Sequence, residues 1–217
     1  MTFWYRVGYT MSRLVAAVYF RRRVIHREKL AVPGGCLVVA NHTSFLDPPM
    51  IGSAFPGPIH YMARKTLFSN PAAKWAYTHC NAIPVDQARP ELSTIKRILQ
   101  LVQQGEKVLI FPEGERTLDG QLKEKGAQGI GMLIAKSRVP VLPVRLYGAY
   151  EALPRGASFP WPKRLTLVVG DLLDLNHLLE SSGLSGKELY QALSDRAMEA
   201  IAALKLPEDE SPAEGGN

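Results

Sequence analysis

The sequence predicts an α/β fold: a single layered domain in which helices flank a largely parallel central sheet. Short apolar runs rich in β-branched residues alternate along the chain with segments whose apolar residues recur at helical spacing. Strands that alternate with helices are joined by crossover connections, which is the arrangement of a parallel sheet. A chain of 217 residues is also long enough to bury one core of its own.

Five runs are expected to be strands: residues 36–40, 59–63, 107–111, 141–148 and 165–171. Residues 91–104 and 126–138 place apolar side chains at helical spacing, and Gly105 stands at a helix stop position. The last helix is expected to open with a capping box, Ser185 to Glu188, and to run to about Lys205.

The net positive charge of the protein lies in its first 29 residues. They hold seven Lys or Arg and one acid, which accounts for the formal net charge of +6 of the whole chain. The remaining residues carry equal numbers of basic and acidic side chains. Because the rest of the chain has no net charge, a basic surface that binds nucleic acid is not expected.

Residues 1–32 are expected to form a basic amphipathic helical segment that lies on an anionic membrane surface. Aromatic and apolar groups are interleaved with arginines, which is typical of helices in the headgroup plane. The longest charge-free run, residues 14–20, is too short to span a bilayer, and three arginines follow it where a secretory signal would be cleaved. The alternative is a helix packed on the core of its own domain.

The rest of the chain is expected to divide into one domain over residues 33–206 and an acidic tail over residues 207–217. The tail is rich in Pro and Gly, and this composition predicts disorder. Cys36 and Cys80 are too few for a disulfide framework and are expected to be reduced thiols of a cytosolic compartment.

A first polar cluster, His42 to Asp47, directly follows the expected strand 36–40. Ligands of open α/β sheets bind at the carboxyl ends of strands, so this is a suitable place for a site. His42 and Asp47 can meet only if the chain turns sharply between them, and Pro48 is suited to the first turn of a new helix. Asp47 would then fix the tautomer of His42, whose other nitrogen could accept a proton from a hydroxyl. The alternative is that Asp47 caps the helix and His42 caps the strand.

A second polar cluster, Phe111 to Thr117, follows the expected strand 107–111 and presents a glutamate and an arginine in a tight loop. Arg116 could bind a phosphate through its planar two-point fork. Lys123, Lys125 and the amides that open the next helix, near Gly126, could add to an anion site. The alternative is an exposed Glu–Arg ion pair.

The two clusters together, NHxSxxDP and then FPEGxRT about 70 residues later, resemble the PlsC-type glycerolipid acyltransferase family. The resemblance spans about residues 36–148. It implies that His42 is the base, that Asp47 orients it, and that Glu113, Gly114 and Arg116 bind the glycerol phosphate of the acceptor. Lys65 and Thr117 are expected in the same substrate-binding site, and residues 139–143 resemble the motif on the acyl-donor side.

This sequence departs from the family pattern at three places. Residues 64–67 lack the glutamate of the second motif, Gln87 stands where an arginine is usual, and Glu115 replaces a small residue or Thr. Arg89, two residues after Gln87, could substitute for the missing arginine. These differences concern the headgroup of the acceptor.

The resemblance implies an acyltransferase domain over residues 33–206 that acts in phospholipid synthesis on the cytoplasmic face of a membrane, as a peripheral protein. It would move a fatty acyl group from acyl-CoA or acyl-carrier protein to the free hydroxyl of a lysophospholipid, foremost 1-acylglycerol-3-phosphate. No cofactor or metal is expected, because the five histidines form no ligand motif and the cysteines form no CxxC.

Other interpretations remain open at this point. The acceptor could be a different lysolipid, or the chain could be a non-catalytic lipid-binding module. Hydrolysis through Ser44 is a further class, although no GxSxG elbow surrounds it. Ser93 and Lys96 fit SxxK formally but lie within an expected helix, and the chain has no GxxxxGK[ST] or GxGxxG motif for nucleotides.

Overall fold

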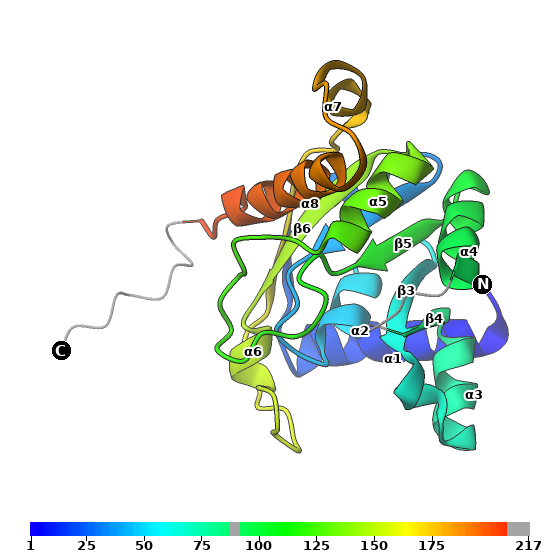
Figure 1. The fold of residues 1–217 in the computed structure, drawn as a ribbon. Helices are drawn as coiled ribbons and strands as arrows, with labels where there is room; N and C mark the ends of the chain where they lie inside the picture. Colours follow the sequence, from blue (N-terminus) through cyan, green and yellow to red (C-terminus); the bar gives the residue numbers. More distant parts are fainter. Residues whose placement is uncertain (87–91, 208–217) are drawn as a thin grey trace.

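The structure, a computed structural model, describes residues 1–86 and 92–207. Its centre is a seven-stranded sheet in the order β1-β7-β6-β2-β5-β3-β4, in which every neighbouring pair is parallel except β6 and β7 (Figure 1). The expected α/β fold with a largely parallel sheet is therefore confirmed. The strands are β1 (Arg23–Ile25), β2 (Cys36–Ala40), β3 (Ile59–Arg64), β4 (Ala82–Val85), β5 (Lys107–Ile110), β6 (Val141–Tyr147) and β7 (Thr166–Val169).

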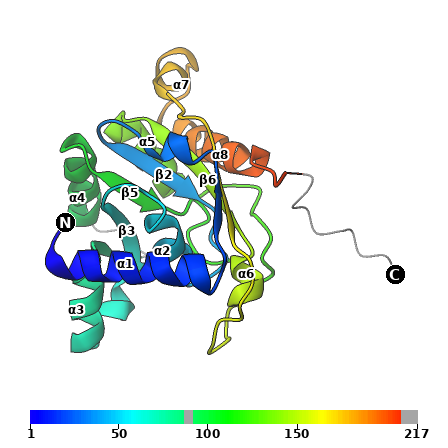
Figure 2. The same ribbon diagram turned by 180° about the vertical axis from the view of Figure 1, so that it is seen from behind.

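Helices cover both faces of the sheet, and β2 at its centre is buried along its whole length. Cys36, Val38 and Ala40 pack in the core beneath α1 (Phe3–Val18) and α2 (Asp47–Gly52), the helices in front in Figure 2. Leu37 and Val39 point to the opposite face, which is covered by α4 (Leu92–Gln103), α5 (Gln128–Ser137) and α8 (Gly186–Ala203). Alternate side chains of one strand thus belong to two cores, which explains its continuous apolar run.

Two strands were not predicted, and both lie at an edge of the sheet. β1 has only three residues, within the segment that was expected to be helical, and pairs with β7. β4 contains Pro84, which weakens a strand prediction, but an edge strand tolerates a proline. Edge strands bury fewer side chains than central ones, so their sequence signal is weak.

The remaining helical elements are short and were also not predicted: α3 (Pro71–His79), α6 (Ala149–Ala152), α7 (Asn176–Ser181) and two 3₁₀ turns, Arg27–Leu30 and Lys65–Phe68. The last helix, α8, begins where expected, with Ser185 as its N-cap. The expected capping box is wrong, however, because the Ser185 side chain makes no cap hydrogen bond in the described part of the chain. Of the expected acidic tail, only Pro207 lies within the described residues.

The N-terminal helix is shorter than the expected segment 1–32, because α1 ends at Val18 and the chain then enters the sheet as β1. The hydroxyl of Tyr9 donates to the Phe55 carbonyl at 2.6 Å, and the Tyr5 hydroxyl accepts from the Ile59 amide at 3.0 Å. These two tyrosines attach α1 to the domain. No helix in the described residues is long and apolar enough to cross a membrane.

Candidate active site

The two polar clusters meet at the carboxyl ends of β2 and β5, which are neighbouring parallel strands. His42 follows the last residue of β2 by two positions, and Glu113 follows the end of β5 by three. The two loops are joined through their main chains, since the Thr117 amide donates to the His42 carbonyl at 2.9 Å. Both clusters therefore lie at the carboxyl edge of the sheet, which is where ligands of open α/β sheets bind.

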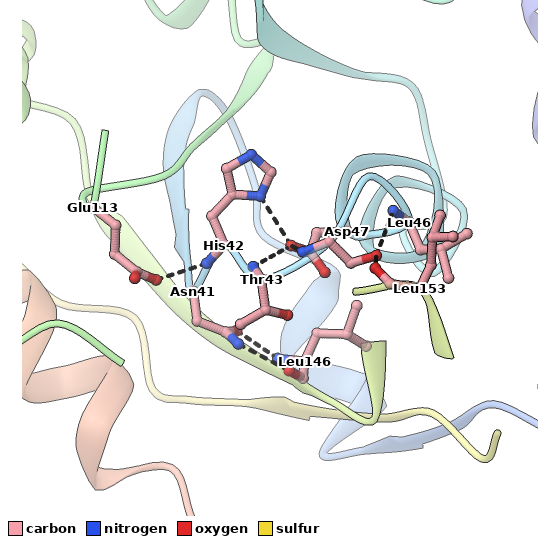
Figure 3. A network of polar contacts seen from close by, with 9 residues as sticks. Asn41, His42, Thr43, Leu46, Asp47, Glu113, Leu146 and Leu153 are labelled. Atoms are coloured by element: carbon pink, nitrogen blue, oxygen red, sulfur yellow. Dashed lines mark hydrogen bonds and ion pairs between the residues drawn. The ribbon is translucent and has the colours of Figure 1, made fainter. Parts of the chain in front are cut away.

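His42 and Asp47 form the hydrogen-bonded pair that the sequence motif suggested (Figure 3). His42 Nδ1 lies 2.9 Å from Asp47 Oδ2, and the Asp47 side chain is fully buried. The amides of Thr43 and Ser44 donate to the same oxygen at 2.7 and 2.8 Å. The carboxylate thus closes the sharp turn and receives Nδ1–H, which leaves Nε2 as the basic nitrogen.

The alternative role of Asp47 as the helix N-cap is wrong. Asp47 is the first residue of α2 rather than its N-cap, which is Leu46. Its carboxylate receives amides that precede the helix, together with the His42 ring. The ring of His42 stacks on Phe111 with centroids 3.9 Å apart, and Figure 3 shows its second nitrogen pointing away from Asp47. The aspartate and the phenylalanine together hold the imidazole in one orientation.

Two residues position the loop in a way that the sequence did not predict: Asn41 was not singled out, and Ser44 was considered only as a nucleophile. The buried Asn41 side chain exchanges two hydrogen bonds with the main chain of Leu146 in β6, at 2.8 and 2.9 Å, and so continues the β2–β6 pairing. The Ser44 hydroxyl donates to the Leu153 carbonyl and accepts from the Leu46 amide. Ser44 is therefore part of the loop scaffold. The signal in the sequence was a polar residue within two positions of the motif histidine.

Glu113 lies beneath the main chain of His42 rather than on the surface. Its Oε1 accepts the His42 amide at 2.7 Å, and the residue is only 5% exposed. The alternative of an exposed Glu113–Arg116 ion pair is therefore wrong. Burial raises the pKa of Glu113 to about 7, against the opposing effect of its hydrogen bonds and of Lys123.

This raised pKa predicts a pH-dependent stability. Because the folded-state pKa lies above the ordinary value of 4.5, the fold favours the protonated carboxyl, and the free energy of unfolding falls as the pH rises from about 4.5 to 7. Glu113→Gln keeps an oxygen for the His42 amide but cannot ionise. Urea unfolding at pH 5 to 8 should show the variant gaining stability over the wild type as the pH rises. A difference that stays constant across this range would contradict the prediction.

Arg116 lies at the mouth of the site, where its guanidinium carbon is 3.5 Å from the centroid of the Phe45 ring. Partial burial and the neighbouring charges of Arg155 and Arg64 lower its pKa. Glu115 lies within 3.8 Å of both Arg64 and Lys123, so the extra acid is paired with cations. The surplus of positive charge around Arg116 suits an anionic ligand.

The other expected binding residues fall in different places. Gly114 lines the cavity described below and has a φ of 77°, a conformation that glycine adopts at low cost. Thr117 is buried and contacts the His42 main chain, and Lys65 is exposed in the 3₁₀ turn after β3. Gln87 and Arg89 lie outside the described residues.

The amides of the two residues that precede α5 are engaged within the protein. The Gly126 amide donates to Asp195 Oδ1, and the Ala127 amide to the Pro112 carbonyl. Lys123 donates to the Glu113 carbonyl at 3.2 Å. The Gly126 and Ala127 amides thus already have partners, and the addition of the first amides of α5 itself to an anion site stays a prediction.

A cavity of about 680 Å³ opens beside His42 and Arg116. Its other lining side chains are mostly apolar and come from β3, α3, α4 and α5, among them Tyr61, Ala76, Ile98 and Leu133. Cavities of this size hold small-molecule ligands, and an apolar lining with a few polar groups at one place suits an amphipathic molecule. The base and the cation thus share one cavity with an apolar compartment.

Comparison with known proteins agrees with this geometry. A family model described as Acyltransferase matches residues 21–147. A 1-acyl-sn-glycerol-3-phosphate acyltransferase of Bacillus subtilis is 29% identical over 187 residues, which are 84% of this chain and 87% of the relative. One of Chlamydomonas reinhardtii is 30% identical over 88% of this chain and 55% of its own length. The crystal structure of the acyltransferase PlsC from Thermotoga maritima shares the fold, with a TM-score of 0.68, 22% identity and coverage of 94% of this chain and 81% of that one.

Proposed function

The chain belongs to the acyltransferase family, and we propose that it moves a fatty acyl group from an acyl thioester to the free hydroxyl of 1-acylglycerol-3-phosphate. The observation that carries the proposal is the His42–Asp47 pair, whose ring borders a cavity with a cation and an apolar lining. The Bacillus and Chlamydomonas relatives, both named as 1-acyl-sn-glycerol-3-phosphate acyltransferases, support this acceptor.

In the proposed reaction His42 acts as a general base without a covalent intermediate. Nε2 takes the proton of the acceptor hydroxyl while that oxygen attacks the thioester carbonyl. The C–S bond then breaks, and the proton on His42 passes to the departing thiolate. Asp47 keeps the ring in the tautomer that this transfer requires, and such a positioned base contributes a factor of ~10²–10⁴ to the rate. The acyl thioester, acyl-CoA or acyl-carrier protein, is a co-substrate, and no cofactor or metal takes part.

Glu113 has a supporting role in this proposal. Its carboxyl group holds the His42 amide and is buried, so it stabilises the loop that carries the base. Gly114 and Arg116 line the cavity and are the groups we assign to the acceptor phosphate, with Thr117 fixing their loop and Lys65 adding charge nearby.

The proposal is tested with purified protein, labelled acyl-CoA or acyl-carrier protein, and a panel of lysolipids that differ in headgroup. Transfer to 1-acylglycerol-3-phosphate is the expected result. Transfer to another lysolipid alone would contradict the proposed acceptor and favour the alternative suggested by Glu115. The absence of transfer with both donors and all acceptors, while lipid binding persists, would favour a non-catalytic lipid-binding module.

Arg116→Ala is expected to raise the KM for the phosphorylated acceptor about tenfold or more, because charge-assisted bonds to phosphate contribute more than neutral ones. Arg116→Lys should recover only part of this loss, since lysine lacks the planar fork. Initial rates at varied acceptor concentration measure the effect. Arg138→Ala is the matched control, because Arg138 is exposed near Glu180 and does not line the cavity. An unchanged KM in Arg116→Ala would contradict the assignment.

We also propose that the protein lies on the cytoplasmic face of an anionic membrane through α1. The helix turns Tyr5, Gly8, Tyr9, Ser12 and Ala16 toward the domain. Its exposed side carries a helically spaced apolar stripe: Phe3, Trp4, Val7, Met11, Leu14, Val15 and Val18. A helix that exposes its apolar stripe while its small and polar side is covered suits the lipid interface, and each nearby arginine adds about 1 kcal/mol on an anionic leaflet.

A further inference from the structure

The loop between α6 and β7, residues 153–164, exposes two large aromatic side chains. Phe159 is 81% exposed and Trp161 is 67% exposed. The loop contains Arg155, Lys163 and Arg164 and no acidic residue. Large exposed apolar groups on a soluble protein mark a contact surface, and aromatic rings next to cations suit the boundary between lipid headgroups and acyl chains.

Hydrogen bonds hold this loop in a defined conformation. The Trp161 amide donates to the Ala152 carbonyl at 2.7 Å, and the Ala157 amide donates to the Pro154 carbonyl at 3.1 Å. Three prolines, at positions 154, 160 and 162, further restrict its backbone. The aromatic rings are therefore presented by an ordered loop, so little conformational entropy remains to be lost on docking.

The loop is continuous with the exposed stripe of α1. The Tyr19 hydroxyl, directly after α1, donates to the Pro160 carbonyl at 2.8 Å. At the other end of α1 the ring of Trp4 contacts Trp75 of α3, with centroids 5.0 Å apart and both rings about half exposed. In both Figure 1 and Figure 2, α3 and the loop after α6 project beyond α1 at the same end of the molecule, opposite to α7.

We propose that residues 153–164 are a second membrane-contacting element, with Phe159 and Trp161 inserted at the interface of an anionic bilayer beside α1. The inference rests on the membrane association proposed above and extends it to a segment remote in sequence. A membrane is favoured over a protein partner because the loop carries three cations and no acidic residue, and its exposed aromatic groups join those of α1 and α3 in one extended series.

This contact would also orient the active site. The first residue of this loop is attached to the loop that carries His42, because the Leu153 carbonyl accepts a hydrogen bond from the Ser44 hydroxyl. Arg155 lies near enough to Arg116 for its charge to lower the pKa of that guanidinium. Docking of the loop therefore places the proposed phosphate site at headgroup level, where a lysolipid can enter without leaving the bilayer.

Single-tryptophan variants of the full chain test the proposal, because the protein has three tryptophans in different elements. Trp4→Phe combined with Trp75→Phe leaves Trp161 as the reporter, and Trp75→Phe combined with Trp161→Phe leaves Trp4. Vesicles of phosphatidylglycerol and phosphatidylcholine with brominated acyl chains should shift the emission of both reporters to the blue and quench it. High salt should weaken both effects.

The two reporters distinguish a membrane contact of the loop from a membrane contact of α1. A response of Trp4 without one of Trp161 would overturn the loop contact and leave the α1 proposal standing, whereas no response of either would overturn both. A Trp161 response to acyl-carrier protein but not to vesicles would also overturn the inference, since the loop would then bind a protein.

A matched pair of variants measures the contribution of the loop. Phe159→Ser with Trp161→Ser should lower the vesicle partition coefficient about tenfold or more, because two large apolar groups no longer leave water. It should raise the KM for vesicle-borne acceptor but not for acceptor dispersed in detergent. Leu184→Ser removes an exposed apolar side chain from the loop between α7 and α8 and should leave both quantities unchanged. Equal partitioning of the two variants would overturn the proposal.

Discussion

Replacing His42 with alanine is expected to lower kcat by ~10²–10⁴-fold, because the variant loses the only group placed to take the acceptor proton in the proposed reaction. The KM for the acceptor should change little, since the phosphate contacts assigned to Arg116 remain. Steady-state kinetics with saturating donor measures both constants. Thermal unfolding of the same variant should show a stable fold, because the imidazole is only partly buried against Phe111.

Asp47→Asn refines this prediction. An asparagine cannot present one carboxylate oxygen to His42 Nδ1 and to the amides of Thr43 and Ser44. The variant should lower kcat by a smaller factor than His42→Ala and alter the pH profile of kcat, because the histidine loses its anionic partner. Full activity of His42→Ala would overturn the mechanism, and full activity of Asp47→Asn would remove the orienting role.

Gly131→Ala is expected to destabilise the protein by at least ~2 kcal/mol, because a side chain at this position has no room. A Cβ on Gly131 would lie 1.6 Å from the Tyr190 carbonyl oxygen of α8. The contact is with main chain, so α8 would have to move away from α5. In a domain of this size the loss corresponds to a fall in Tm of about 4–8 °C.

Gly129→Ala is the matched control on the same helix. No atom lies within 4 Å of a Cβ built at Gly129. Alanine is the better helix former by about 1 kcal/mol, so this variant should be as stable as the wild type or more stable. Calorimetry on the two variants should therefore show shifts of opposite sign. Shifts of the same sign would contradict the packing argument.

The local sequence pattern was sufficient to predict the central strands and the loops that follow them. β2 is buried on both faces along its whole length and β5 from Val108 onward, so these runs are apolar, and the polar motifs directly follow them. The edge strands β1 and β4 were missed because a short strand, or one with Pro84, does not need that pattern. The short helix α3 was missed although Asn70 caps it, because none of its residues is buried and such a helix needs no apolar stripe at helical spacing.

In the active site, too, the sequence predicted which residues form the two loops but not how these residues contact one another. The spacing of His42 and Asp47 left open whether they meet, and the turn that brings them together depends on two amides that converge on one carboxylate oxygen. Glu113 was expected among the acceptor-binding groups, yet it lies under the His42 main chain because β2 and β5 are neighbours in the sheet. That adjacency arises from strand order, which motif spacing along the chain does not encode.

The sequence by itself determined the fold class, the family resemblance and the residues of the two motif loops, because each depends on short-range pattern. Only the tertiary structure decided which side of α1 is covered and that the loop after α6 lies at the end of this helix. Periodicity describes the faces of a helix, but the face that meets the domain depends on contacts with residues far along the chain. Here Tyr5 and Tyr9 make those contacts, and the apolar stripe is left exposed.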